Sequence, residues 1–130
     1  MYLLDTNALI ILMYGEVTEA RLSGDAMNKM LDSEELYLSI VSLWELAIKK
    51  KIGKLNINNS IHDIAVKCDE ENIKIIPIKI EHMDKTLELP LNANHKDPFD
   101  RLILSTALSE EMVLISTDAK MQNYGVDVMS

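Results

Sequence analysis

The chain is poor in cysteine and in long apolar runs, and each shortage excludes a class of protein. Cys68 is the one cysteine among 130 residues, so an internal disulfide and a thiolate metal cluster are both excluded. Cys68 shares a helical spacing with Ile61 and Ile64, which predicts a core position. No apolar run approaches the ~20 residues that span a bilayer. The apolar stretch at 8–14 follows Asp5 without a basic leader, unlike a signal peptide. We therefore expect an intracellular, cytoplasmic protein.

Positive charge is also scarce. The net charge is −8, from 21 acidic and 13 basic residues. This argues against a nucleic-acid binder that works by bulk electrostatics, because phosphate neutralisation needs a surplus of Lys and Arg. The excess of acids suits a chain that gathers carboxylates around a cation, and it equally suits a solvated surface. At 130 residues with 48% hydrophobic side chains, the chain has the size of one domain with its own core.

Short apolar strands alternate with helical segments along the chain, which indicates a parallel sheet covered by helices. Gly, Pro, Ser and Asp residues at the expected ends supply the start and stop signals. We expect strands at 2–4, 36–39, 73–76, 112–115 and 126–128. We expect helices at 8–13, 24–33, 40–51, 61–71, 81–88, 98–111 and 119–123. The sequence contains no internal repeat or linker.

Four acids stand where polar residues are not expected. Asp5 and Asp118 each follow an apolar strand, and parallel strands finish on the same edge of a sheet. Glu45 interrupts the otherwise apolar helical row of Val41, Ile48 and Ile52. Asp100 shares a helical row with the apolar residues Ile103, Leu104 and Ala107. A carboxylate directed toward a core needs a partner.

A divalent cation is an economical partner for these four acids. Four carboxylates at one sheet edge would repel each other and raise each other's pKa unless a cation intervened. Because cysteine and paired histidines are missing from the expected ligand set, the oxygen ligands favour Mg²⁺ or Mn²⁺ over zinc.

Each acid also has a purely structural interpretation. Asp5 and Asp118 can cap the helices that follow them. Glu45 lies three residues after Ser42, which is capping-box spacing, and Lys49 lies at i+4, where it can form an ion pair. Asp97 is a good N-cap before Pro98, so we assign it to starting the helix, with a peripheral water-mediated role as the alternative.

Five segments in a fixed order resemble a known family. They are LLDTNALI at 3–10, SIVSLWELAIKKKIGKL at 39–55, LP at 89–90, HKDPFDRLILSTA at 95–107 and LISTD at 114–118. Together they resemble PIN-domain proteins, and in particular VapC-type toxin ribonucleases of bacterial and archaeal toxin–antitoxin pairs. That branch most often has histidine where this chain has Asn7, and other PIN branches have asparagine there.

The resemblance implies a fold and a reaction. The fold would be an α/β protein, a PIN-like three-layer α/β/α sandwich with a central, mainly parallel sheet of four to five strands, forming a single domain over residues 1–130. The activity would be that of an endoribonuclease, a hydrolase that cuts RNA through a metal-activated water and leaves a 5′-phosphate and a 3′-hydroxyl. No histidine has a convincing place as a general base, so the residues agree with a metal-dependent reaction.

The resemblance also assigns residues and partners. Asp5, Glu45, Asp100 and Asp118 would be the catalytic and metal-binding acids. Asp5, Glu45 and Asp100 would hold Mg²⁺ or Mn²⁺ directly or through water, and Asp118 would orient water or a second ion. The supporting residues would be Thr6, Asn7, Ser116 and Arg101. The partners would be an RNA substrate, a cognate antitoxin and a second copy of the chain in a homodimer.

Basic residues have two interpretations. Arg101 or Lys96 could steady the scissile phosphate. Lys49, Lys50, Lys51 and Lys54 could carry the RNA backbone, or they could reflect the ordinary preference for cations near a helix C-terminus. An apolar surplus on two early helices could be buried in a homodimer or in the core. That surplus comprises Ile11, Leu12, Met13, Met27, Met30 and Leu31.

Two other classes of function remain open. A receiver-type signalling domain also has an acidic Mg²⁺ pocket on a sheet of this size, but it normally has adjacent acids after an early strand, and Asp5 and Asp118 have no acidic neighbour. A catalytically silent module of the same fold, binding a metal or a protein partner, would keep the architecture without the chemistry.

Overall fold

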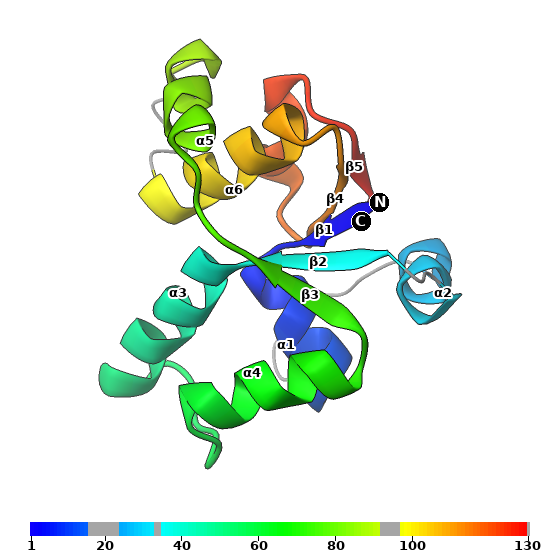
Figure 1. The fold of residues 1–130 in the computed structure, drawn as a ribbon, viewed down its shortest axis with the longest axis vertical. Coiled ribbons are helices and arrows are strands. Elements are labelled where there is room, and N and C mark those ends of the chain that lie inside the picture. The colour runs from blue at the N-terminus through cyan, green and yellow to red at the C-terminus, as the bar shows by residue number, and fades with distance from the viewer. Residues whose placement is uncertain (16–23, 33–34, 92–96, 130) are drawn as a thin grey trace.

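A five-stranded parallel sheet forms the centre of the molecule in the computed structural model, which describes residues 1–15, 24–32, 35–91 and 97–129 (Figure 1). The strands lie in the order β3-β2-β1-β4-β5, and each neighbouring pair is parallel. Their bounds are Tyr2–Leu4 (β1), Leu36–Ser39 (β2), Ile73–Ile76 (β3), Val113–Ile115 (β4) and Val128–Met129 (β5). The predicted α/β class and the parallel sheet are confirmed.

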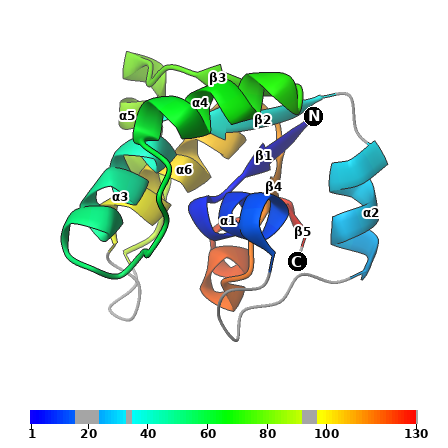
Figure 2. The ribbon, with the colours of Figure 1, turned by 90° about the horizontal axis from the view of Figure 1, so that it is seen from below.

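Helices cover both faces of this sheet (Figures 1 and 2). The α-helices are Thr6–Tyr14 (α1), Gly24–Asp32 (α2), Ile40–Lys51 (α3), Ile61–Glu70 (α4), Ile80–Lys85 (α5) and Pro98–Ser109 (α6). Two 3₁₀ helices span Thr86–Glu88 (η1) and Ala119–Tyr124 (η2). The helices α1 and α4 pack on one face, and α6 and η2 pack on the other. Within the described residues, no helix has the length and apolar character needed to cross a membrane.

Alternation along the strands builds one hydrophobic core on each face of the sheet. Leu4 and Ile115 are buried in the core beneath α1 and α4, whereas Leu3 and Leu114 are buried in the core beneath α6. Both faces are therefore apolar, as expected for a parallel sheet covered on both sides. The α3 helix contributes residues to both cores, so it lies where the two layers meet.

The strand order separates this fold from receiver domains. Receiver domains have the flavodoxin-like order 2-1-3-4-5. Here β1 lies between β2 and β4, and β3 is at the edge. The receiver alternative is therefore wrong, because the strand order differs. Alternation of strands and helices in the sequence does not reveal strand order.

Most element boundaries were predictable from caps and periodicity. The bounds of β1, β2, β3 and α3 match their predictions, and α6 ends two residues before the predicted 111. The last strand was predicted at 126–128 and lies at Val128–Met129. After η2, Gly125 adopts a left-handed conformation (φ 73°), and Val128 pairs with Leu114. The chain therefore uses residues 126 and 127 to reach the sheet.

Core packing accounts for several residues that the sequence left open. Cys68 is fully buried, as predicted, and burial raises the pKa of its thiol to about 11. Ile11 is buried, and Leu12 and Met13 pack against the same core. Three of the six residues in the apolar surplus therefore pack in the core of the chain itself. The side chains of Met27, Met30 and Leu31 lie outside the described part of the structure.

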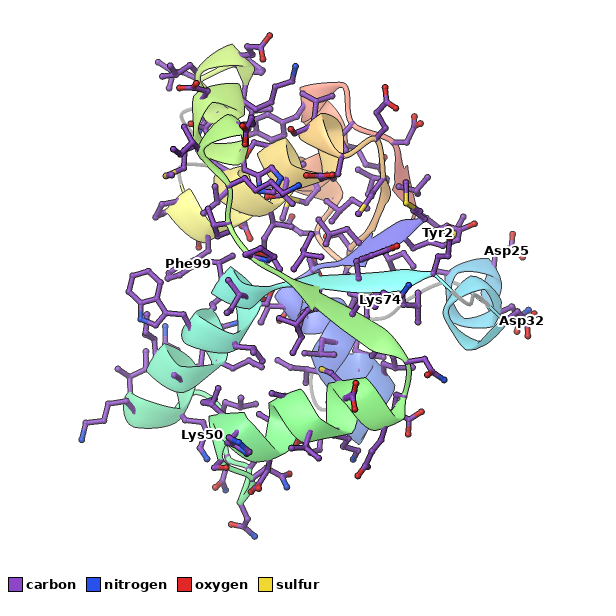
Figure 3. The ribbon with its side chains drawn as sticks, viewed as in Figure 1. Tyr2, Asp25, Asp32, Lys50, Lys74 and Phe99 are labelled. Atoms are coloured by element: carbon purple, nitrogen blue, oxygen red, sulfur yellow. The ribbon has the colours of Figure 1, made fainter. Side chains whose placement is uncertain are left out.

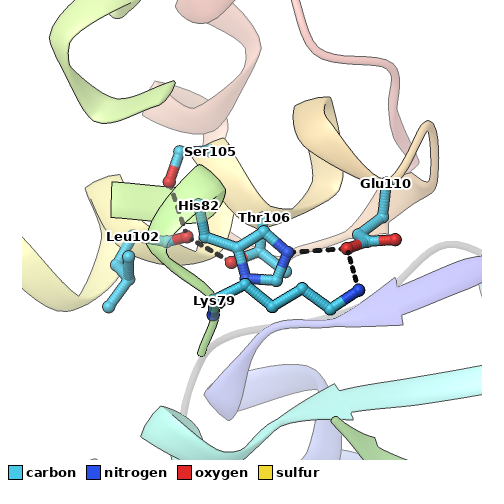
Figure 4. Close-up of polar contacts among 6 residues, drawn as sticks. All are labelled: Lys79, His82, Leu102, Ser105, Thr106 and Glu110. Carbon is cyan, nitrogen blue, oxygen red and sulfur yellow. Dashed lines mark hydrogen bonds and ion pairs between the residues drawn. The ribbon is translucent and has the colours of Figure 1, made fainter. Parts of the chain in front are cut away.

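A polar network fastens α5 to α6 on the second face (Figure 4). The fully buried imidazole of His82 accepts a hydrogen bond at Nδ1 from the backbone N–H of Lys79 (3.1 Å), which leaves the proton on Nε2. His82 Nε2 then donates to Glu110 Oε1 (2.7 Å), and Lys79 Nζ also contacts that oxygen (3.2 Å). His82 is thus a satisfied structural histidine, near the opposite end of α6 from Asp100.

The network predicts a pH-dependent loss of stability in Glu110→Gln. The hydrogen bond from His82 and the nearby Lys79 hold the pKa of Glu110 below its usual range, so its carboxylate stabilises the fold at neutral pH and loses this contribution as the pH falls through the lowered pKa. Removing the charge should cost about 1 kcal/mol, which is roughly 2–6 °C in Tm at pH 7, and the deficit should shrink toward pH 3.

Thermal unfolding followed by circular dichroism measures the difference. Glu88→Gln is the matched control, because Glu88 forms an exposed ion pair with Lys85 (3.0 Å) and should change Tm little. Equal Tm losses in the two variants would show that the buried network carries no special share of the stability.

Candidate acidic site

The site begins with Asp5, the residue that follows β1. Its carboxylate is almost completely buried and accepts a hydrogen bond from the backbone N–H of Ala8 (2.8 Å), so it is the N-cap of α1. The predicted capping role is confirmed. Capping needs one oxygen at a helix end, which is usually exposed, so burial of the whole side chain goes beyond that role.

Sheet register places Ser116 beside Asp5. Leu4 pairs with Ile115, and the backbone N–H of Asp5 donates to the carbonyl of Ile115 (3.0 Å). Ser116 directly follows β4, and its fully buried hydroxyl hydrogen-bonds the Asp5 carboxylate. The Ser116 oxygen also accepts the backbone N–H of Asp118 (3.0 Å). Ser116 therefore links the segment that follows β1 to the segment that follows β4.

These two strands meet where the strand order changes direction. The chain passes from β1 outward to β2 and β3, and then returns to place β4 on the other side of β1. In open α/β sheets, ligands bind in the crevice outside the carboxyl ends of the strands at such a point. Asp5 and Ser116 stand at that position.

The environment of Asp5 makes its ionised form costly. The pKa of Asp5 is raised to about 6, chiefly by burial and also by the negative charges of Asp100 and Glu45, although hydrogen bonds from Ser116 and Ala8 act in the opposite direction. Asp100 and Glu45 are thus close enough to act on Asp5 electrostatically. The structure brings three of the four predicted acids into one electrostatic group.

Glu45 reaches the site from α3, held by hydroxyl groups. Thr6 Oγ1 lies 2.5 Å from Glu45 Oε1 and 3.0 Å from Ser42 Oγ. A carboxylate only accepts, so Thr6 donates to Glu45 and Ser42 donates to Thr6. This chain of hydrogen bonds joins the start of α1 to the middle of α3 and orients the Glu45 carboxylate.

One structural alternative for Glu45 is wrong and the other is confirmed. The capping box at Ser42 does not form, because Ser39 is the N-cap of α3. The side-chain oxygen of Ser39 accepts a hydrogen bond from the backbone N–H of Val41. The i,i+4 pair does form, with Lys49 Nζ 3.4 Å from Glu45 Oε2. Both oxygens of Glu45 therefore have partners from the chain itself.

The two acids of α6 have different roles. Asp97 is exposed and caps the helix, accepting hydrogen bonds from the backbone N–H groups of Phe99 (2.8 Å) and Asp100 (3.3 Å). Its assignment as the residue that starts the helix is confirmed. Asp100 lies in the first turn, half-buried, in line with the buried residues Ile103 and Leu104. Its charge acts on Asp5.

Asp118 is the N-cap of η2, with Oδ1 accepting the N–H of Lys120 (3.0 Å). Its capping role is confirmed, and it is joined to Asp5 through Ser116. In the described part of the chain, no three Asp, Glu, His or Cys side chains are arranged so that they could hold one metal ion. The shared metal site of the four acids stays a prediction.

Three of the predicted RNA-contacting residues, Lys49, Lys50 and Lys54, lie at the C-terminal end of α3. Lys49 pairs with Glu45, and Lys50 donates to the carbonyl of Asn59 near the start of α4 (Figure 3). Lys54 and Asn7 are exposed, and Lys96 lies outside the described residues. Lys49 and Lys50 are in the last turn of α3, along with Lys51, as the helix-terminus interpretation expects.

Arg101 is used for positioning a neighbouring segment. Its guanidinium donates to the backbone carbonyls of Thr86 (3.1 Å), Leu89 (3.3 Å) and Pro90 (3.0 Å). These bonds tie the first turn of α6 to the segment that leads into it. The predicted role of Arg101 at a phosphate has no support in these contacts.

Ser42 is the site residue that the sequence interpretation missed. It is fully buried and contacts Thr6, although it lies inside a helix. Its spacing of three residues from Glu45 places both on the same helical face, which was the available signal. The same spacing is that of a capping box, so only the position of the helix start distinguishes the two interpretations.

The raised pKa predicts that Asp5→Asn stabilises the protein at high pH. The pKa of Asp5 is about 6 in the folded state and 3.8 in the unfolded state, so the unsubstituted protein loses stability as the pH rises from about 4 to about 6. This difference of about two pH units corresponds to about 3 kcal/mol. Asparagine keeps an oxygen for Ala8 N–H, so the variant should gain up to this amount at pH 8 and nothing at pH 4.

Urea unfolding in EDTA at the two pH values measures this gain. Asp63→Asn is a control of opposite sign, because hydrogen bonds from Ser60 lower the pKa of the exposed Asp63 carboxylate. That variant should lose stability at pH 8 relative to pH 4. A pH-independent effect of Asp5→Asn would show that the pKa of Asp5 is not raised in the folded protein.

Solved structures with the same architecture come from bacterial complexes. A chain of VapBC-1 from nontypeable Haemophilus influenzae aligns with a TM-score of 0.70 and 21% identity, covering 99% of this chain and 96% of that one. A chain of FitAcB from Neisseria gonorrhoeae aligns with a TM-score of 0.68 and 18% identity, covering 100% and 97%. A toxin–antitoxin complex from Klebsiella pneumoniae contains a chain with a TM-score of 0.62 and 19% identity, covering 100% and 97%.

At these identities the likeness establishes the fold. Comparison with curated proteins finds no match. The family described as PIN domain matches residues 2–127, nearly the whole length of the chain. The match includes every acid of the candidate site, and the chain belongs to the PIN domain family.

Proposed function

We propose that the protein is a Mg²⁺- or Mn²⁺-dependent endoribonuclease and the toxin of a toxin–antitoxin pair. The observation that carries the proposal is the buried carboxylate of Asp5 at the switch point of the sheet, with the charges of Glu45 and Asp100 acting on it. Membership of the PIN domain family supports nuclease chemistry, and a chain of the toxin–antitoxin complex from Klebsiella pneumoniae shares the fold.

The residues fit a hard divalent cation in their chemistry. The donors are carboxylate oxygens, which Mg²⁺ and Mn²⁺ prefer, and a cation would relieve the cost of ionising Asp5. Asp5, Glu45 and Asp100 would hold it directly or through water, and Asp118 would orient water or a second ion. When bound, the cation would lower the pKa of a water molecule and would offset the charge that develops on the scissile phosphate.

The other residues would prepare these acids. Ser116 donates to Asp5 and accepts from the backbone of Asp118, so it sets the position of one acid relative to the other. Thr6 and Ser42 orient Glu45. Such support keeps the carboxylates in place when a substrate binds. Lys54 is exposed and could contact an RNA backbone, whereas Lys96 lies outside the described residues. Arg101 keeps the segment before α6 in place.

The cellular setting follows from the same proposal. The protein would act in the cytoplasm, where its RNA substrate is, and a cognate antitoxin would bind it. A homodimer would bury apolar side chains that remain on the surface. The RNA substrate and the homodimer are taken from the resemblance to VapC-type toxins, and the antitoxin is also supported by the toxin–antitoxin complex that shares the fold.

A catalytically silent module is the second candidate, and Glu45 is the observation that favours it. Both of its oxygens have partners within the chain, so an incoming cation would have to compete with Lys49 for Oε2. If this competition always favours lysine, the acids would serve the fold or a protein partner. The two predictions below distinguish the candidates.

Asp100→Asn should abolish Mg²⁺-dependent RNA cleavage, by at least about 100-fold. Stability should be unchanged or raised, since the substitution removes a negative charge that acts on Asp5. Cleavage of labelled tRNA, rRNA and mRNA by metal-reconstituted protein measures the activity. Asp97→Asn is the control from the same helical turn, because it alters the cap alone and should keep its cleavage per folded molecule. Cleavage retained by folded Asp100→Asn would refute the proposal.

Glu45→Gln and Lys49→Gln should change the response to Mg²⁺ in opposite directions. A ligand that binds only the folded state raises Tm by mass action. Without the Glu45 carboxylate this rise should disappear. Without Lys49 the rise should begin at a lower Mg²⁺ concentration, because the competing cation is gone.

Differential scanning calorimetry across a Mg²⁺ series measures both effects. The rise in Tm for the parent should reach several degrees when Mg²⁺ is about 100-fold above its Kd. An undiminished shift in Glu45→Gln would remove Glu45 from the site. If the rise in Tm begins at the same Mg²⁺ concentration in Lys49→Gln as in the unsubstituted protein, the ion pair does not oppose metal binding.

A further inference from the structure

The first turn of α6 carries Asp100, and the cap of that helix does not determine where the turn lies in space. Asp97 accepts hydrogen bonds from Phe99 and Asp100 of the same helix, so it determines only where the helix begins in the sequence. The fully buried side chains of α6, Ile103 and Leu104, come one turn later. Helix ends fray, because their first N–H groups have no intrahelical partner. The position of the Asp100 turn therefore depends on contacts with other elements.

Arg101 makes such a contact with the segment at 86–90. Its Nη1 and Nη2 atoms donate to three backbone carbonyls of that segment, over distances of 3.0 to 3.3 Å. The planar guanidinium presents its N–H groups in a fixed fork, so three such bonds restrain both the position and the orientation of the turn. Leu89 of the same segment is buried in the core beneath α6, which gives Arg101 a firm support.

The 86–90 segment is also tied to the opposite end of α6. It continues from α5, where His82 and the preceding Lys79 contact Glu110, directly after α6 (Figure 4). Between these two points α5 packs against α6 (Figure 1). One continuous stretch of chain thus holds α6 at both ends, and Arg101 makes the attachment beside Asp100.

An aromatic contact also joins the first turn of α6 to another helix. The ring of Phe99 meets that of Trp44 on α3 edge to face, with centroids 5.3 Å apart, where the start of α6 approaches α3 (Figure 3). Trp44 is largely exposed, and contact between two rings tolerates more sliding than hydrogen bonds do. The bonds from Arg101 are therefore the more directional restraint on this turn.

We propose that Arg101 is a positioning residue of the acidic site, which holds the start of α6 so that the Asp100 carboxylate stays close to Asp5. The inference rests on the proposed metal-dependent function and adds a residue that acts through Asp100. The negative charge of Asp100 acts on Asp5, and like charges repel. Without a directional restraint, this repulsion would move the Asp100 turn outward and widen the space between the two carboxylates.

A comparison of two substitutions separates position from charge. Arg101→Lys keeps the positive charge, but its donors are on a single nitrogen and cannot reproduce the bonds that Nη1 and Nη2 make to three carbonyls. Arg101→Gln removes the charge as well. If Arg101 acts by positioning, both variants should show the same defect. If its charge acts on a substrate, Arg101→Lys should retain most of the function.

Amide hydrogen exchange and a Mg²⁺ series test the proposal on the full chain without relying on cleavage. In both variants the amides at 101–104 should exchange about tenfold faster in the metal-free protein, while those at 105–109 stay protected. The rise in Tm with Mg²⁺ should begin at a concentration about tenfold higher, because Asp100 is no longer held near Asp5. Glu110→Gln is the matched control from the other end of α6: it should lower Tm and leave the onset of the Mg²⁺ response unchanged.

Steady-state RNA cleavage at saturating Mg²⁺ and below Tm adds a readout that loss of stability alone would not change. Both Arg101 variants should lower kcat about tenfold per folded molecule and leave KM nearly unchanged, because a group that acts on the reaction is displaced while contacts with the substrate are kept. Glu110→Gln should keep the kcat of the unsubstituted protein.

Several results would overturn the positioning role while the proposed function stands, provided that the unsubstituted protein cleaves RNA and responds to Mg²⁺. Variants that match it in exchange, Mg²⁺ response and kcat would show that Arg101 does not position Asp100. A raised KM in Arg101→Gln that Arg101→Lys restores would place Arg101 on the substrate. Loss of folding in both variants, or an equal change of the Mg²⁺ response in Glu110→Gln, would assign Arg101 to the fold as a whole.

Failure of the proposed function has a different signature. The unsubstituted protein would then neither cleave RNA nor gain stability from Mg²⁺, and the positioning role would fail with it, even if the amides at 101–104 exchange faster in the Arg101 variants.

Discussion

Burial of the Asp5 carboxylate is the constraint around which the rest of the site is arranged. A buried carboxylate needs hydrogen bonds, and Asp5 obtains them from Ala8 on α1 and Ser116 after β4. The bond from Ala8 is local to the helix start, whereas the bond from Ser116 depends on the sheet, because the pairing of Leu4 with Ile115 brings the ends of β1 and β4 together. A shift of one residue in the pairing of β1 with β4 would turn Ser116 away from Asp5 and would place the side chains of β4 on the opposite faces of the sheet.

The same constraint extends to α3 through hydroxyl groups. Thr6 follows Asp5 and is itself buried, so its hydroxyl needs a partner, which it finds in Glu45 and Ser42. Glu45 therefore approaches the site because the start of α1 holds it there. Asp100 differs, since it enters on α6, whose start is set by the Asp97 cap and by the bonds from Arg101 to the preceding segment. Two acids reach Asp5 by independent structural routes.

Much of the fold could be predicted from the sequence because its signals are local. Ser39 and Ser60 cap α3 and α4, and the pairing of strand with helix along the chain specifies a parallel sheet. Strand order is not local, so the sequence pattern did not distinguish this topology from that of a receiver domain. The acids at the ends of β1 and β4 were also predictable, because parallel strands finish on one edge.

The contacts of individual polar side chains were less predictable. Ser42 and Lys49 lie at i−3 and i+4 from Glu45, and each spacing fits both a local and a long-range role. Lys49 has the local role and Ser42 the long-range one, because Ser39 is the N-cap of α3 and Ser42, inside the helix, contacts Thr6. Arg101 shows the same limit, since its carbonyl partners at 86–90 belong to a segment that only tertiary packing brings near.

The electrostatic balance of the site follows from these contacts. Asp5 carries the cost of burial and receives hydrogen bonds without a cation, whereas Glu45 has Lys49 as a counterion. The like charges of Glu45 and Asp100 act on Asp5, so the site stores repulsion that a divalent cation would relieve. Such a site is less stable without an ion than a neutral one would be, and this cost makes sense where the acids are retained for binding or for chemistry.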